Sequence, residues 1–261
     1  MSKKKNLSEN PVAVTLAGLL LALQQGAIDL HVSSGNDKMG DIPYISMPAG
    51  EDPIYRSDGA LLRDFPGTCC GCCSGCKGDC YALAIEVYRD KARIAYAENY
   101  ILAKYAPELF REKVVKWLKC SNIRCFRWHE SGEFFSYEYM QLVCEICAMF
   151  PRIQFYAYTK RFAWLRKAKD AGIIPPNFKI NVSARRENSA ALKKYLPEFT
   201  QFIWDCSNLV TSDYAPISCE HCKAVQFNGK KTGTTCIECE RCIYGNEDTA
   251  VFDHSKRAHK K

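Results

Sequence analysis

The fold is decided by residues 154–183, which read QFYAYTKRFAWLRKAKDAGIIPPNFKINVS. Residues 154–159 predict a strand, and residues 162–171 predict a helix that ends at Gly172. Residues 178–183 predict the next strand. A strand, a helix and another strand in this order are typical of two neighbouring parallel strands.

The same alternation continues on both sides of this stretch, which predicts an α/β fold with a parallel sheet or a barrel. Pro107 divides a long helical region, and an amino-terminal helix ends near Gly26. The further predicted helices cover residues 12–23, 81–119, 136–149 and 187–195, and the further predicted strands cover residues 43–47, 123–128 and 199–206.

Composition gives the wider limits. The chain has 261 residues, of which 47% are hydrophobic and 25% charged, as in an ordinary globular protein. Much of the net charge of +7 comes from lysines near the two ends, so a nucleic-acid partner is possible but not indicated. The apolar run at residues 12–23 is too short to span a bilayer, so we expect no membrane association.

Cysteines mark the domain organisation. Six of the sixteen lie between Cys69 and Cys80, too close together for a disulfide scaffold, which indicates metal ligation in a reducing cytoplasm. The predicted division is a lead-in with a helix and turns (1–66), an α/β body with the cysteine loop (67–208) and a cysteine-rich, metal-binding tail (209–261).

The cysteine loop offers two spacings for three ligands. Cys69, Cys76 and Cys80 form Cys-x6-Cys-x3-Cys, and Cys73 in place of Cys69 gives Cys-x2-Cys-x3-Cys. Three thiolates on a four-iron cluster leave one iron open to a substrate or cofactor. A structural zinc site that takes four of the six cysteines is the alternative.

Polar residues follow three of the predicted strands. Because parallel strands end at the same edge of a sheet, we expect these residues and the cysteine loop to share one rim. The residues are Arg127, His129, Ser131, Gly132 and Glu133 after the strand 123–128, Tyr158 to Arg161 after the next strand, and Asn181, Ser183, Arg185 and Arg186 around the strand 178–183.

The tail contains a second set of metal-like spacings, in which four of the five thiols would bind zinc or a second iron–sulfur cluster. Cys144 and Cys147 lie in a predicted helix and are expected to pack in the core. We interpret Cys120, Cys125 and Cys206 as buried or incidental thiols. The tail cysteines are Cys219, Cys222, Cys236, Cys239 and Cys242.

Several of these stretches resemble the phage gene 88 protein family, and the resemblance covers most of the chain. It also implies the cytoplasm of a host cell as the protein's location. The stretches are residues 36–43 with Ser46 and Pro48, Thr68 to Ala82, Arg127, His129, residues 131–136, residues 157–160 and Cys236 to Cys242.

A looser resemblance is to radical S-adenosylmethionine enzymes, which have a three-cysteine loop after the first barrel strand and a Gly-Gly-Glu-type turn after the second. It implies a partial (β/α) barrel of that type, a [4Fe-4S] cluster, S-adenosyl-L-methionine as cofactor, and flavodoxin or ferredoxin as reductant. Cys69, Cys76 and Cys80 would hold the cluster, although those enzymes usually have Cys-x3-Cys-x2-Cys. The residues predicted to bind the cofactor are Ser131, Gly132, Glu133, Arg127, His129 and Ser183.

Two functions from different classes therefore remain open. One is a radical S-adenosylmethionine-type enzyme that acts on an unknown substrate. The other is a zinc-binding phage protein without enzymatic activity that binds nucleic acid or a host protein. The metal content of the protein discriminates between them.

Overall fold

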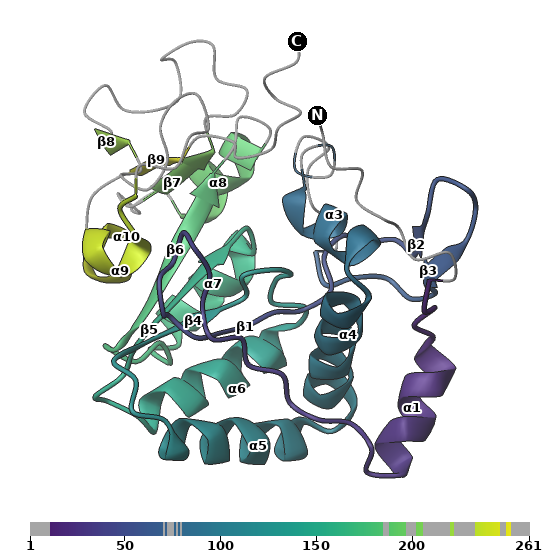
Figure 1. The fold of residues 1–261 in the computed structure, drawn as a ribbon. Coiled ribbons are helices and arrows are strands. Elements are labelled where there is room, and N and C mark those ends of the chain that lie inside the picture. Colours follow the sequence, from purple (N-terminus) through teal and green to yellow (C-terminus); the bar gives the residue numbers. More distant parts are fainter. Residues whose placement is uncertain are drawn as a thin grey trace.

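A computed structural model describes residues 11–69, 71, 76, 78, 80–184, 188–196, 202–205, 220–221, 233–245 and 249–251. Its larger sheet has seven strands, and every pair of neighbours in it is parallel (Figure 1). In spatial order the strands are β1 (Tyr44–Ile45), β4 (Cys125–Trp128), β5 (Gln154–Thr159), β6 (Phe178–Ala184), β7 (Phe202–Asp205), β9 (Thr249–Val251) and β8 (Glu220–His221).

The mixed α/β class and the parallel sheet agree with the sequence prediction. The predicted partial barrel is not shown: the described strands form a sheet with β1 and β8 at its two edges. A small antiparallel sheet of β2 (Ile54–Tyr55) and β3 (Leu61–Arg63) was not predicted. In the sequence these two strands come after β1 and before the cysteine loop. Each is too short to give a periodic signal.

The helices begin and end close to where the sequence predicts, for local reasons. Pro107 is the first residue of α5, where the N–H that proline lacks has no helical partner. Ser136 Oγ accepts a hydrogen bond from Tyr139 N and caps α6, and Gly172 takes φ +64° just after α7. The helices up to this point are α1 (Leu16–Gln24), α3 (Tyr81–Tyr88), α4 (Asp90–Tyr105), α5 (Pro107–Cys120), α6 (Tyr137–Ala148) and α7 (Phe162–Asp170), followed by α8 (Ser189–Tyr195).

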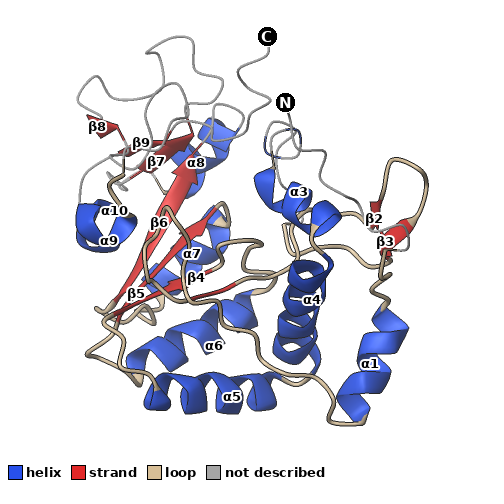
Figure 2. Cartoon of the chain, in the orientation of Figure 1, coloured by secondary structure: helices blue, strands red, loops and turns tan. Residues whose placement is uncertain are grey.

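The sheet has two different faces because successive side chains of a strand point to opposite sides. Phe126, Trp128 and Phe155 belong to the main core and pack with apolar residues of α5, α6 and α7. Figure 2 shows α5 and α6 beneath the strands. We call the opposite side the second face, and it carries Cys125, Arg127, Tyr156, Tyr158, Lys179 and Asn181.

Part of the cysteine-rich tail covers the second face. The short helices α9 (Cys236–Cys239) and α10 (Arg241–Tyr244) lie beside β5 and β6, away from α6 and α7 (Figure 1). Asn181 Nδ2 donates to Cys242 O at 2.9 Å, and Lys179 Nζ donates to Arg241 O at 3.0 Å and to Gly245 O. Among the described helices, none is long and apolar enough to cross a membrane.

A candidate site at the carboxyl ends of the strands

The structure brings the cysteine loop to the end of the sheet where β4, β5 and β6 have their carboxyl ends. The loop precedes α3, the Ser131–Glu133 turn follows β4, Lys160 follows β5, and Ser183 is near the end of β6. Lys160 Nζ donates to Ser183 Oγ at 3.0 Å, which joins two of these strand ends directly. Arg185 and Arg186 lie outside the described residues.

Thr68 links the start of the cysteine loop to the turn after β4. Its Oγ1 donates to Pro48 O and accepts from Glu133 N, both at 2.8 Å, while Arg161 Nη2 donates to Thr68 O at 3.0 Å. Arg161 Nε also donates to Phe134 O at 3.1 Å. Since Cys69 is the next residue after Thr68, these bonds fix the backbone position of Cys69, the first predicted ligand.

Gly132 is required by the shape of the turn. It has φ +81°, and a Cβ at this position would lie 2.6 Å from Met47 Cβ and 2.7 Å from Thr68 Oγ1. The neighbouring Ser131 O accepts a hydrogen bond from Met47 N at 2.9 Å, so the turn lies directly on the segment after β1. Ser131 is buried, and its hydroxyl has no hydrogen-bond partner among the described residues.

Glu133 connects β4 to β5 through its carboxylate. Its two oxygens accept hydrogen bonds from Phe134 N at 2.9 Å, Thr159 Oγ1 at 2.9 Å and Lys160 N at 2.8 Å. Burial raises the pKa of the carboxyl, and these hydrogen bonds oppose that change. With three protein donors, the side chain positions the turn on the end of β5.

Cys69, Cys76 and Cys80 are half-buried thiols, and they influence one another electrostatically. Burial raises the pKa of Cys69 to about 12, and the Glu133 carboxylate, Cys80 and Cys76 act in the same direction. Burial also raises the pKa of Cys80, and the Lys160 ammonium partly opposes this change. The alternative ligand Cys73, together with Cys70 and Cys72, lies outside the described residues.

No group of three or more His, Cys, Asp or Glu side chains in the described part of the chain could hold a single metal ion. Cys219 and Cys222 are outside that part, whereas Cys236, Cys239 and Cys242 are half-buried within α9 and α10. The described tail cysteines, Cys236, Cys239 and Cys242, therefore lie on the segment that covers the second face.

Among the described residues, neither Arg127 nor His129 forms a hydrogen bond to a loop cysteine. His129 is buried at φ +57°, and its ring packs edge-on against Phe134 while Nε2 lies 3.0 Å from the Tyr139 hydroxyl. Burial, with a smaller effect from Arg127, lowers its pKa to about 3, so the ring is neutral. His129 thus occupies the helix-covered core, and Arg127 lies on the second face.

Sequence reasoning missed the buried ion pair that closes the chain around the cysteine loop. Arg63 on β3 and Glu86 on α3 are fully buried, with Nη1 and Oε2 2.6 Å apart. Glu86 Oε1 also accepts from Ala49 N at 2.6 Å. A charged residue inside a mostly apolar helix was the available signal. For Cys144 and Cys147 the prediction of core packing is confirmed, because both are buried.

Cys125, which the sequence predicted to be a buried or incidental thiol, is indeed buried. It lies on the second face, in the apolar cluster against which Cys236 packs. Burial raises its pKa to about 12, and Cys236 acts in the same direction. The exposed Cys120 has no comparable surroundings in the described structure.

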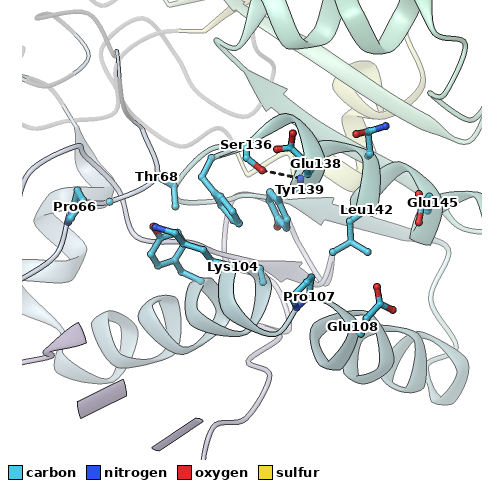
Figure 3. Close-up of a pocket in the computed structure, with 15 residues that line it drawn as sticks. Pro66, Thr68, Lys104, Pro107, Glu108, Ser136, Glu138, Tyr139, Leu142 and Glu145 are labelled. Carbon is cyan, nitrogen blue, oxygen red and sulfur yellow. Dashed lines mark hydrogen bonds between the residues drawn. The ribbon is translucent and has the colours of Figure 1, made fainter. Parts of the chain in front are cut away.

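A separate hollow of about 620 Å³ lies between the start of α5 and α6 (Figure 3). Tyr100, Lys104, Tyr139 and Glu108 are among its lining residues. Thr68 lines it as well, but none of the predicted ligand or cofactor-binding residues does. The hollow is therefore distinct from the candidate site at the strand ends.

Comparisons with known proteins agree with one of the two resemblances. The comparisons with curated proteins and with solved structures found no match, and none supports the resemblance to radical S-adenosylmethionine enzymes. One family model, described as gene product 88, matches residues 30–245. This range includes the cysteine loop, every strand of the larger sheet except β9, and α9 and α10. The chain belongs to the phage gene product 88 family.

Proposed function

We propose that this protein is an iron–sulfur enzyme of the radical S-adenosylmethionine type, in which Cys69, Cys76 and Cys80 hold a [4Fe-4S] cluster. The observation that carries the proposal is their arrangement at the carboxyl edge of a parallel sheet. There the three half-buried thiols lie at the same rim as the Ser131–Glu133 turn and Lys160. Ligands of open α/β sheets bind at this edge.

The donor set fits such a cluster. Thiolates are the usual ligands of iron–sulfur clusters, and three of them leave one iron available to a cofactor. Each thiolate binds a different iron, so the three sulfurs need not meet at one point as they would around a single ion. Without a bound cation, burial keeps Cys69 protonated at neutral pH, and metal binding would release that proton.

Bound at this site, the cluster would supply an electron to S-adenosylmethionine, which is the chemistry that the cofactor pair contributes. The protein's own residues would bind the cofactor and orient it. Gly132 and Thr68 keep the turn against the loop, and Lys160 with Ser183 offers a cation and a hydroxyl beside the thiols. Glu133 acts here as a positioning residue, because three protein donors already occupy its oxygens.

The tail is proposed to hold a second metal centre, either zinc or an iron–sulfur cluster, with four of its five cysteines. Cys236, Cys239 and Cys242 lie on two helices of four residues each, which bury too little surface to order themselves. Bound metal would contribute on the order of 10 kcal/mol to the folding of such a segment.

The test is the content of iron, sulfide and zinc in protein prepared without oxygen, combined with binding of S-adenosylmethionine by calorimetry. We expect iron, sulfide and a brown colour, and we expect Cys69→Ala, Cys76→Ala or Cys80→Ala to remove the loop cluster. Cys120→Ala, at an exposed thiol, is the matched control. Zinc as the sole metal, or no binding of S-adenosylmethionine to the loaded protein, contradicts the proposal and favours the zinc-binding alternative.

A further inference from the structure

Arg127 occupies an unusual position on the second face of the sheet. It is half-buried and in register with Tyr44 on β1 and Tyr156 on β5. Its guanidinium carbon lies 4.9 Å from the centre of the Tyr158 ring. Such cation–π contact stabilises a cation without neutralising its charge.

The hydrogen-bonding capacity of Arg127 is largely unused. Nη1 donates to Met39 Sδ at 3.1 Å, a weak acceptor, and Nη2 is 3.5 Å from His129 O, at the limit of a hydrogen bond. The buried Nε has no partner, and no carboxylate among the described residues forms an ion pair with Arg127. A guanidinium fork with five donors normally meets a carboxylate or phosphate when it is removed from water.

Most of the ionisable groups around Arg127 are uncharged at pH 7, so they do not neutralise its charge. The ionisable groups around Arg127 are the phenols of Tyr81, Tyr156 and Tyr158, with a weaker contribution from the Glu130 carboxylate. Phenols are neutral at pH 7. Lys179 lies in the same row of the sheet as Arg127, with Tyr156 between them. Two cations thus share this row.

The position is also near both cysteine groups. Tyr81 follows Cys80 directly, and its hydroxyl donates to Glu130 O at 2.7 Å, three residues beyond Arg127. On the other side, Tyr156 packs in the cluster that contacts Cys236. A molecule that contacts Arg127 would therefore lie between the candidate cluster and the tail.

We propose that Arg127 binds an oxyanion of the substrate, either a carboxylate or a phosphate group. That this anion belongs to the substrate rests on the function proposed above. Lys160, whose charge acts on Cys80, is better placed for the cofactor. The anion site itself needs neither the cluster nor the cofactor and is measured separately.

The experiment is titration calorimetry of the full-length protein as purified, with inorganic phosphate and with acetate, at constant ionic strength set by chloride. We expect one of the two anions to bind the wild type, at least tenfold weaker binding by Arg127→Gln, and an intermediate loss with Arg127→Lys. Arg152→Gln removes the same charge at an exposed turn and should bind as the wild type does. Which anion binds distinguishes a phosphate-bearing from a carboxylate-bearing substrate.

Thermal unfolding without added anion separates a binding role from a structural one. If Arg127 serves binding, removing its unneutralised charge leaves the Tm of Arg127→Gln at or above the wild-type value. A Tm several degrees lower, equal anion affinity in Arg127→Gln, or no anion binding by the wild type overturns the proposal. The iron content of Arg127→Gln should equal that of the wild type, so a failure of the cluster proposal is seen independently.

Discussion

The two cysteine groups of this protein are held in place by different kinds of contact. The loop that contains Cys69 and Cys80 is joined to the strand ends by buried and half-buried hydrogen bonds and is closed by the buried Arg63–Glu86 pair. The tail segment with Cys236 to Cys242 consists of two very short helices. Hydrogen bonds from Lys179 and Asn181 hold these helices on the second face.

The difference indicates which site the protein itself constructs. Buried polar networks are rigid when every member has its partner, and Glu133 and Thr68 meet this condition. The flanks of the loop should keep their geometry without metal, whereas the tail should depend on its ligand. Four substitutions test this contrast.

The largest effect is expected from Arg63→Met, which leaves Glu86 buried without its partner. We expect the free energy of unfolding in urea to fall by about 3–5 kcal/mol, the usual cost of breaking a buried ion pair. Asp58→Asn weakens the pair between Arg56 and the exposed Asp58 in the same hairpin and should change stability much less than Arg63→Met does. Equal effects of the two substitutions would contradict the assigned role of the Arg63–Glu86 pair.

Gly132→Ala should come next, because the new methyl group meets Met47 and Thr68 at a positive φ. Overpacking and backbone strain together should cost about 3 kcal/mol in urea unfolding. Gly172→Ala has a similar φ of +64° but no atom within 4 Å of its Cβ, so it should cost only about 1 kcal/mol. A smaller loss for Gly132→Ala than for Gly172→Ala would show that the turn is not tightly packed.

His129 should make the stability of the fold sensitive to acid. Its pKa is about 3 when folded against 6.5 when exposed, so the folded state binds fewer protons between these values. The contribution of the neutral ring is complete above pH 6.5 and is lost as the pH falls toward 3. By pH 5 the loss should be about 2 kcal/mol. His129→Gln should remove this part of the pH dependence, and parallel curves for both proteins would refute it.

The smallest effect on overall stability is expected from Lys179→Met, which removes the bonds to Arg241 O and Gly245 O. The loss should be about 1 kcal/mol. Hydrogen exchange should become faster in residues 236–245 and stay unchanged in residues 125–133. Lys193→Met, at an exposed position of α8, is the control. Faster exchange in both segments would mean that the tail and the loop side are not separately held.

The sequence by itself determined the order of the main elements. The observed β5 has the predicted bounds, α7 ends within a residue of its prediction, and Pro107 separates α4 from α5. These features depend on local patterns, such as the spacing of apolar residues and the geometry of proline and glycine, which act over a few residues. The parallel sheet followed from the alternation of strands and helices, and so did the gathering of the strand ends at one rim.

Only the tertiary structure decided which residues meet across long distances. Arg63 and Glu86 are 23 residues apart, Thr68 and Glu133 are 65 apart, and both pairs depend on how the hairpin and strands pack. The same holds for His129, which the structure buries in the core, and for Arg127, which it places on the second face. Two residues apart in a strand, these side chains would share one face, but His129 lies just beyond the end of β4 at φ +57°, and this local backbone conformation turns its side chain toward the core.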